Sequence, residues 1–397
     1  MEKGASIRNR KPKDGAFRQQ RLRAWQPHLR PTVVIPTLFI IGILFMIAGG
    51  LLYWNSGKTH ELMIDYSTCQ HYDHPIYLAP SMYDYRFDSS PKYDVSRTNS
   101  PLVDPTQPPV FHYINTTTFQ TNNDDPTYHN PNNITIKQCT LDFTVPSTMK
   151  APVFMYYRMT QFYQNHRQYA KNVDPGQLLG TPVDAGSADS NCQPITTNSD
   201  NTKIVFPCGL IANSMFNDSI SDLTLISTSG DGQMQQQQQQ RYVWYKNGLV
   251  WPTEYHKYGS TGYQINQIIP PPNWAVRFPQ GQYTAQYPPP DLGKSMERLK
   301  VWMSVAALPD FRKIWGRNEN QDLSAGRYRV TIDLNFDTLG YGGKKYLVLT
   351  TSSPLGGRNF YLGLTYLAVG GLCLLLATLF SFLHCIKPRN LNGSITL

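Results

Sequence analysis

The chain has 397 residues, of which 36 are Lys or Arg and 27 are Asp or Glu. Eleven of the basic and two of the acidic residues lie at positions 1–32 and 384–397, so the long segment between these tails carries 25 of each sign. Because a nucleic-acid-binding surface needs clustered basic side chains, this balance excludes nucleic acid as the partner of the central segment.

The N-terminal tail, residues 1–32, is basic and precedes a long apolar run. Its basic residues are Lys3, Arg8, Arg10, Lys11, Lys13, Arg18, Arg21, Arg23 and Arg30. The run at 33–54, VVIPTLFIIGILFMIAGGLLYW, has no charged residue and is long enough to cross the roughly 30 Å hydrocarbon core of a bilayer as a helix. A cleaved signal peptide does not fit, because its apolar core spans only about 7–15 residues and follows a short leader. We therefore expect a signal anchor.

Alternation of apolar and polar residues predicts β-strands in the central segment, 55–359. The clearest case is RYRVTIDLNFD at 327–337, and the same pattern occurs in CTLDFTV at 139–145 and ERLKVWMSV at 297–305. We expect a large β-rich domain, an antiparallel sandwich that is jelly-roll-like, with short helices and long loops.

Polar and Pro-rich pieces separate these strands. Residues 84–132 are rich in Asp, Asn, Thr and Pro, and 262–291 contains PPPNW and YPPP, so both are expected to be extended loops or polyproline segments over the sheets. The run QMQQQQQQ, which ends at Gln240, predicts a disordered excursion without chemistry of its own.

The stretch APVFMYYRMTQFYQNHRQYAKN at 151–172 holds six aromatic residues, one His and two Arg. VFMYY suits a strand, and from Met159 onward Phe162, His166 and Tyr169 have the spacing of one helical face, with Tyr163 and Arg167 beside it. Tyr and Arg at this density favour a protein contact or a tightly packed core, and the pattern does not separate the two.

The second apolar run, FYLGLTYLAVGGLCLLLATLFSFL at 360–383, is also free of charge, and the tail 384–397 has Lys387 and Arg389 but no acid. By the positive-inside rule both tails are cytosolic and 55–359 is luminal or extracellular. The basic tails are expected to meet anionic inner-leaflet lipid or an acidic cytosolic partner. Small residues would let the helices approach closely. They are Gly42, Gly49, Gly50, Gly363, Gly370 and Gly371.

Four cysteines lie in the central segment, Cys69, Cys139, Cys192 and Cys208. An even number in an oxidising compartment suggests two disulfides. The loop from Cys192 to Cys208 is the easiest to close, which leaves Cys69 with Cys139. A zinc site is the alternative, although the spacings are irregular and no CxxC pair occurs.

Sequons agree with this topology. Asn115, Asn133 and Asn217 are expected glycosylation sites, whereas Asn392 would face the cytosol and stay unmodified.

Motifs for catalysis are absent from the sequence. HExxH, GxSxG and CxxC do not occur, and GYGGKKY at 340–346 lacks the spacing of a phosphate-binding loop. His71 and His74 could begin a metal site, and His166 could act as a base, but each is more simply explained as an exposed or hydrogen-bonded histidine. We expect no catalytic residue, no metal and no cofactor.

Several segments resemble the signature segments of one family. They are KPKDGAFRQQRLRAWQP at 11–27, FYQNHRQYAKN at 162–172, PCGLIANSMFNDS at 207–219, PPPNW at 270–274, VWMSVAALPDFRKIWGR at 301–317 and the final apolar run. They resemble the cell-division-control-fifty/ligand-effect-modulator family, which comprises the accessory β-subunits of type IV P-type ATPases, the lipid flippases. The resemblance runs in order along most of the chain and does not cover 84–132 or the Gln run.

The resemblance implies a non-catalytic subunit that binds the catalytic α-subunit and membrane lipids. It also implies that the protein escorts its partner from the endoplasmic reticulum to the Golgi, endosome or plasma membrane and supports the transport cycle. The alternatives are a membrane-anchored luminal glycan-modifying enzyme and an adhesion or receptor module. The candidates for the partner interface are Phe17, Arg18, Arg21, Arg23, Trp25, Tyr157, Phe162, Tyr163, His166, Arg167, Tyr169, Asn213, Phe216, Trp274, Arg312 and Arg317.

Overall fold

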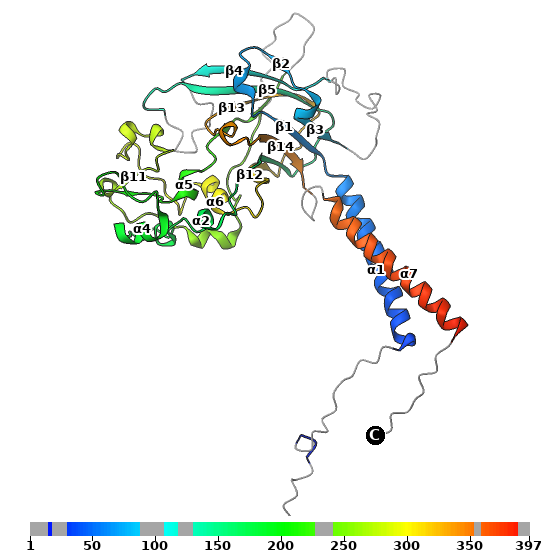
Figure 1. Ribbon diagram of the computed structural model, residues 1–397. Helices are drawn as coiled ribbons and strands as arrows, with labels where there is room; N and C mark the ends of the chain where they lie inside the picture. The colour runs from blue at the N-terminus through cyan, green and yellow to red at the C-terminus, as the bar shows by residue number, and fades with distance from the viewer. Residues whose placement is uncertain are drawn as a thin grey trace, which may run out of the picture. The chain divides into compact units, whose positions relative to one another are not determined.

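The computed structural model describes residues 15–17, 30–87, 107–117, 130–226, 241–352 and 359–387. The chain divides into two compact units, one formed by Met1–Tyr53 with Phe360–Leu397 and the other by Trp54–Asn359. The first unit is a helix pair, made of α1 (Pro31–Gly57) and α7 (Phe360–Ile386), and the second is a β-rich domain (Figure 1). Both helices are long and apolar enough to cross a membrane, and only 11% of the most apolar window of each is buried. They extend the two expected spans by two or three residues at their ends.

Glycines hold the helix pair together. A Cβ on Gly49 would lie 2.8 Å from the backbone nitrogen of Leu367, and a Cβ on Gly42 would lie 2.7 Å from the Leu374 side chain. Gly363 and Gly370 make similarly close approaches from α7. At Gly50 and Gly371, by contrast, an added Cβ would have no neighbour within 4 Å, so these two glycines take no part in the contact. Four of the six glycines are therefore where the two backbones meet.

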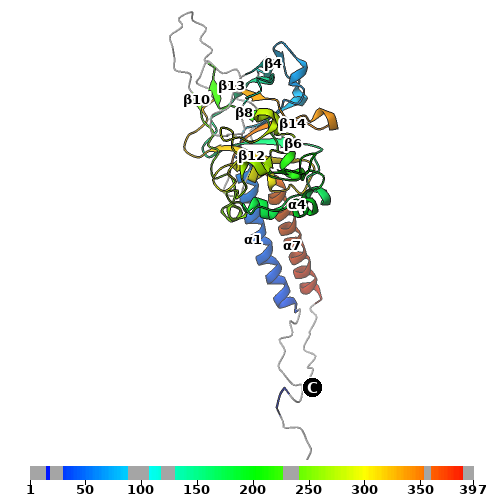
Figure 2. The ribbon, with the colours of Figure 1, turned by 90° about the vertical axis from the view of Figure 1, so that its left-hand side faces the viewer.

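The β-rich domain contains two antiparallel sheets (Figures 1 and 2). The five-stranded sheet has the order β12 (Phe311–Asn318), β6 (Val153–Met159), β14 (Lys345–Thr351), β1 (Glu61–Asp65) and β3 (Tyr83–Arg86). The seven-stranded sheet has the order β10 (Arg241–Tyr242), β9 (Leu223–Leu225), β13 (Gly326–Asp333), β5 (Ile136–Val145), β4 (Val110–Thr116) and β2 (Ile76–Tyr77), with β8 (Ser219–Ile220) also paired to β13. A short parallel pair joins β7 (Ile204–Val205) and β11 (Ile268–Ile269). The expected antiparallel β-rich fold is confirmed.

Short helices and turns fill the connections. The α-helices are α2 (Arg167–Ala170), α3 (Pro175–Leu178), α4 (Ala185–Cys192), α5 (Leu210–Asn213) and α6 (Glu297–Met303). The 3₁₀ turns are η1 (Cys69–His71), η2 (Pro80–Met82), η4 (Pro252–Lys257), η5 (Ile265–Gln267), η6 (Ala275–Arg277), η7 (Pro279–Gly281) and η8 (Leu339–Tyr341). Side-chain caps start some of them, since Asp174 accepts a hydrogen bond from the Gln177 nitrogen at 2.9 Å before α3.

One core lies between the two sheets. In β6 the side chains of Val153, Met155, Tyr157 and Met159 point inward and are buried, which is the period of two that a half-buried strand requires. Tyr157 stacks on Phe216 with ring centroids 3.9 Å apart, and Trp315 meets both rings edge-on. Each such buried aromatic side chain contributes roughly 1.5–3 kcal/mol of transfer free energy.

A buried ion pair connects this core to the end of the five-stranded sheet. The Lys345 Nζ donates to Asp218 Oδ2 at 2.7 Å, and both side chains are at most 5% exposed. The Tyr66 hydroxyl donates to the same oxygen at 3.1 Å, while the backbone nitrogens of Asn335 and Phe336 donate to Oδ1 at 2.7 Å each. Burial, reinforced by the Asp218 charge, raises the pKa of the Tyr66 hydroxyl well above its ordinary value, so Tyr66 remains a neutral donor.

Three expectations about local structure are wrong. Residues 297–303 form α6 rather than a strand, because Leu299 and Trp302 are buried three residues apart among strong helix formers. The helix expected from Met159 onward is reduced to α2, because Met159 ends β6 and Gln161 turns the chain with a φ of 58°. The strand expected to reach Phe336 ends at Asp333, where the next backbone donors turn to Asp218.

The expected loops are also partly corrected. Strand β4 lies within 84–132, much of which is outside the described residues, as is the Gln run. The 262–291 piece is largely irregular, as expected of a loop, and it includes three short 3₁₀ turns and strand β11. GYGGKKY is a turn into β14, as expected, with Gly342 at a φ of 72°.

The Asp218–Lys345 pair generates a stability prediction. Asp218→Asn keeps the two backbone hydrogen bonds that Oδ1 accepts, but it leaves the buried Lys345 charge without a carboxylate and with the Phe336 carbonyl oxygen as its acceptor. We therefore expect the free energy of unfolding of the β-rich domain to fall by about 3–5 kcal/mol. The measurement is denaturant unfolding followed by tryptophan fluorescence. The double variant D218N/K345M, which buries no unpaired charge, should recover most of the loss. As a control, Asp142→Ala removes the exposed Arg329–Asp142 pair and should cost at most about 1 kcal/mol. A D218N loss no larger than this control would contradict the assigned role.

Candidate interaction surface

The outer face of the five-stranded sheet carries a cluster of arginine, tyrosine and carboxylate side chains. The outward side chains of β6 are Phe154, Tyr156 and Arg158, which alternate with the buried ones. Arg158 is the cross-strand partner of Arg312 in β12 on one side and of Tyr346 in β14 on the other. Arginine and tyrosine therefore meet across three neighbouring strands, because cross-strand partners share one face of a sheet.

Carboxylates balance the arginines on this face. Arg158 binds Asp310 through two hydrogen bonds, Nε to Oδ1 at 2.8 Å and Nη2 to Oδ2 at 2.6 Å. Arg312 donates to Glu61 at 3.0 Å. Glu61 also lies 3.8 Å from Arg86. We call the set Glu61, Asp84, Arg86, Tyr156, Arg158, Asp310, Arg312 and Tyr346 the arginine face.

Aromatic rings support two of these cations. The Arg158 guanidinium lies 5.2 Å from the centre of the Tyr346 ring, and that of Arg312 lies 5.3 Å from the Tyr156 ring. The hydrogen bond to Asp310 raises the pKa of Arg158, so this cation keeps its charge throughout the physiological range. Burial raises the pKa of Tyr156 and of Tyr346, which stay neutral.

A hollow of about 350 Å³ lies in the arginine face. Its walls are Glu61, Met63, Arg86, Arg158, Asp310, Phe311, Arg312 and Val348. The hollow combines apolar area with fixed charges of both signs, and it contains no Ser, Cys or His that could serve as a nucleophile or base. This composition suits contact with another protein, because arginine and tyrosine are enriched at interfaces.

A buried lysine holds the loop that supplies Asp310. Lys313, next to Arg312 but pointing inward, donates to the carbonyl oxygens of Val301 at 3.0 Å and Trp302 at 2.9 Å, and also to that of Ser304. These carbonyls end α6, so Lys313 caps the helix and anchors the turn that leads to Asp310. Burial lowers the pKa of Lys313 to about 7.

The interface candidates named from the sequence separate by exposure. Tyr157, Phe216 and Trp274 are buried and form part of the core. Phe162, Tyr169, Asn213 and Arg317 are half-buried, and Phe162 packs edge-on against Tyr169. Phe17, Tyr163, His166, Arg167 and Arg312 are exposed. Arg18, Arg21, Arg23 and Trp25 lie outside the described residues.

The 151–172 stretch thus divides between two roles. In its first half, which forms β6, the inward side chains pack in the core and the outward side chains form the centre of the arginine face. In its second half, His166 is exposed and does not share a face with Phe162 and Tyr169. Of the arginine face, the sequence-based list contains only Arg312. It missed Glu61, Asp84, Arg86, Tyr156, Arg158, Asp310 and Tyr346. The alternation in VFMYYRM gives an outward as well as an inward set of side chains, and the outward set would have identified Tyr156 and Arg158.

The domain contains both expected disulfides, and its three sequons differ in exposure. Cys69 is bonded to Cys139 and Cys192 to Cys208, which are the two pairs favoured above. Among the described residues, no cluster of three or more His, Cys, Asp or Glu side chains is arranged to hold a metal. Asn115 and Asn133 are exposed. The third sequon differs, because the Asn217 Oδ1 is buried and the Asp218 and Ser219 that follow it lie in the core.

Comparison with known proteins gives a family match over nearly the whole chain. The model of the LEM3 (ligand-effect modulator 3)/CDC50 family matches residues 52–390. The phospholipid-transporting ATPase accessory subunit CRF1 of Saccharomyces cerevisiae is 36% identical over 389 residues, which cover 97% of this chain and 88% of the relative. The accessory subunit CDC50 of Chaetomium thermophilum is 35% identical, with 96% and 89% covered. Cell cycle control protein 50A of Mus musculus is 30% identical, with 99% and 93% covered.

Proposed function

Because the chain belongs to the LEM3/CDC50 family, we propose that it is the non-catalytic accessory subunit of a phospholipid-transporting P-type ATPase. The observation that carries the proposal is the alignment with such accessory subunits over 97% of the chain. In this role the protein binds the catalytic subunit, accompanies it out of the endoplasmic reticulum and supports its transport cycle at the Golgi, the endosome or the plasma membrane.

The proposed topology places both tails in the cytosol and the β-rich domain in the lumen or outside the cell. The excess of Lys and Arg in the tails supports this orientation. The distribution of cysteines supports it as well, since the bonded pairs lie in the domain and the free thiols of Cys373 and Cys385 lie in α7. The protein is an integral membrane protein with two spans.

The arginine face is the proposed docking site for the luminal loops of the catalytic subunit. An exposed ion pair contributes at most about 1 kcal/mol to the stability of the domain, so its arginines can exchange an internal carboxylate for one on a partner at little cost. Exchange of this kind gives orientation and specificity, because the guanidinium fork binds a carboxylate in one plane. The exposed Tyr163, His166 and Arg167 supply a second, smaller set of candidate contacts.

Such a contact gives the subunit a way to act on transport. A partner shifts a conformational equilibrium only if it binds the two states unequally. If the luminal loops approach the arginine face more closely in one state of the ATPase, the chain stabilises that state without taking part in the chemistry.

The direct test is affinity purification of the full-length chain from its own membranes in mild detergent, followed by mass spectrometry. The proposal predicts that a P-type ATPase of the phospholipid-transporting class is recovered with it. Recovery of the chain alone, or with extracellular ligands only, would instead favour an adhesion or receptor module.

A matched pair of variants tests the docking site. Arg158→Ala and Arg329→Ala each remove one two-pronged Arg–Asp pair, the first from the arginine face and the second from the outer face of the other sheet. We expect R158A to reduce recovery of the ATPase by about tenfold or more, as loss of an interface arginine worth at least about 1.4 kcal/mol would do, and R329A to leave recovery unchanged. Both variants should retain the thermal stability of the wild-type domain within about 1 kcal/mol. Equal recovery with the two variants would remove the arginine face as the docking site.

Glycan occupancy tests the topology. We expect glycans on Asn115 and Asn133, which are exposed, and on Asn217, whose side chain is half-buried. Substitution of each Asn by Gln, followed by glycosidase treatment and gel mobility, reads this out directly. N115Q, N133Q and N217Q should each remove one glycan. A chain that carries no glycan at any site would contradict a luminal domain.

A further inference from the structure

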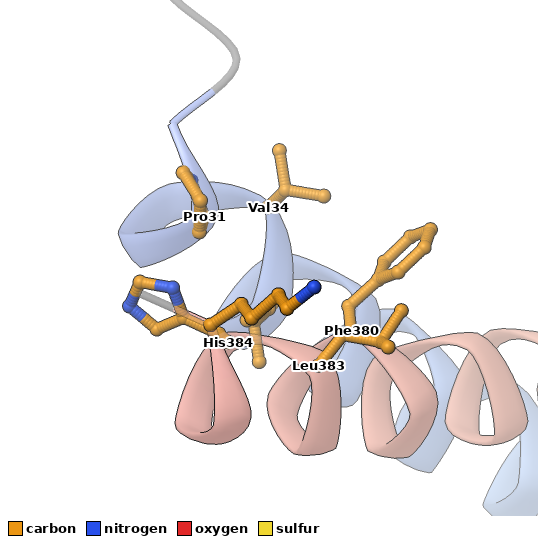
Figure 3. Close-up of a pocket in the computed structure, with 7 residues that line it drawn as sticks. Pro31, Val34, Phe380, Leu383 and His384 are labelled. Atoms are coloured by element: carbon orange, nitrogen blue, oxygen red, sulfur yellow. The ribbon is translucent and has the colours of Figure 1, made fainter. Parts of the chain in front are cut away.

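The two helices of the first unit line an open cavity of about 450 Å³ at the ends that lead to the tails (Figure 3). It is lined by Pro31, Val34, Ile35, Phe380, Leu383, His384 and Lys387. Figure 3 shows Pro31 and Val34 of α1 opposite Leu383 and His384 of α7. The cavity belongs to the helix pair alone and has no part in the arginine face.

The packing of the helix pair explains why a cavity opens at this end. Close approach requires small residues, and after the contact of Gly42 with Gly370 and Leu374 the last one toward this end is Ala377 of α7, which is fully buried. Beyond it the facing residues are larger, and Figure 1 shows α1 and α7 diverging toward Pro31 and Ile386. The α1 residues of the lining run only from Pro31 to Ile35, a helix rise of about 6 Å, so the opening is a short wedge at the end of the helix pair.

The lining has the polarity of a phospholipid. Deep in the wedge the side chains are apolar, namely those of Val34, Ile35 and Phe380, whereas His384 and Lys387 stand in the last turn of α7 and just beyond it. No acidic residue lines the cavity. An acyl chain matches the inner walls, and a phosphate matches the lysine and histidine at the mouth, since basic residues at a membrane surface attract anionic headgroups.

We propose that this wedge binds one anionic phospholipid, with an acyl chain between α1 and α7 and its phosphate at Lys387 and His384. A transmembrane helix of a partner is the other possible occupant, but it would need a groove along the whole length of the pair, and the lining ends at Phe380, before the fully buried Ala377. The proposal rests on the membrane topology proposed above, which places the site in the cytosolic leaflet. It does not depend on assembly with an ATPase.

Photolabelling of the isolated full-length chain tests this site. The chain is placed in nanodiscs of phosphatidylcholine that contain a minor fraction of phosphatidylserine with a diazirine in its acyl chain, and labelled peptides are mapped by mass spectrometry. We expect labelling at 31–35 and 380–387 that unlabelled phosphatidylserine prevents and additional phosphatidylcholine does not. Lys387→Gln should lower labelling about fivefold relative to Arg30→Gln, which removes a charge at the same helix end from a residue that does not line the cavity.

A second pair of variants separates filling of the cavity from general effects on the helix. Val34→Trp places a large side chain in the cavity and should abolish labelling, whereas Val33→Trp changes the neighbouring residue, which is 57% exposed and does not line the cavity, and should preserve it. Equal labelling of the two variants, or equal labelling by a phosphatidylcholine probe, would overturn the proposal. If V34W lowers recovery of a partner ATPase while lipid labelling persists, the wedge receives a partner helix and the lipid site is wrong. Because labelling uses the chain alone, a failure of the ATPase assembly would leave this result unaffected.

Discussion

The architecture of the β-rich domain depends on the buried contact between Asp218 and Lys345. Lys345 begins β14, which is a central strand of one sheet, while Asp218 directly precedes β8 of the other sheet and accepts the backbone donors that follow β13. A buried pair of this kind is tolerated only if its remaining hydrogen-bonding positions are filled, and Tyr66, Asn335 and Phe336 fill them. The contact therefore ties the two sheets together at one end, and it holds the Asp218 and Ser219 of the NDS sequence at 217–219 in the core.

The proposed interaction with a partner depends on the outward-facing side chains of the five-stranded sheet. The inward side chains of the five-stranded sheet are committed to the core, so its outward residues are free to present arginine, tyrosine and carboxylate groups to a partner. Strand β1 follows α1 after a short connection, and β14 ends shortly before α7. Strands β1 and β14 belong to the sheet that carries the arginine face, and along the chain they are the strands nearest to the two membrane spans. This connection suits a subunit that contacts a membrane-embedded partner.

The features that the sequence could predict are those that depend on composition along the chain. The two spans, the tails and the β-rich class follow from charge and from periodicity, and the spans and the β-rich class hold in the structure. Local alternation failed at 297–303, where burial of Leu299 and Trp302 follows a helical period. Pairing across strands lies beyond a single sequence, so the meeting of Arg158 with Asp310, 152 positions away, was not foreseeable. The same holds for the Asp218–Lys345 contact, and the cavity between the helix ends needs the three-dimensional packing of both spans.

We propose that this chain enables phospholipid transport by another protein, which carries out the chemistry. The most direct measurement is ATP hydrolysis and phospholipid translocation by the co-purifying ATPase in vesicles, with and without the chain, together with the chain alone. We expect both activities to require the chain and the ATPase together, and we expect the chain alone to hydrolyse no ATP. Transport by the ATPase that is equally fast without the chain, or turnover by the purified chain itself, would contradict the claim.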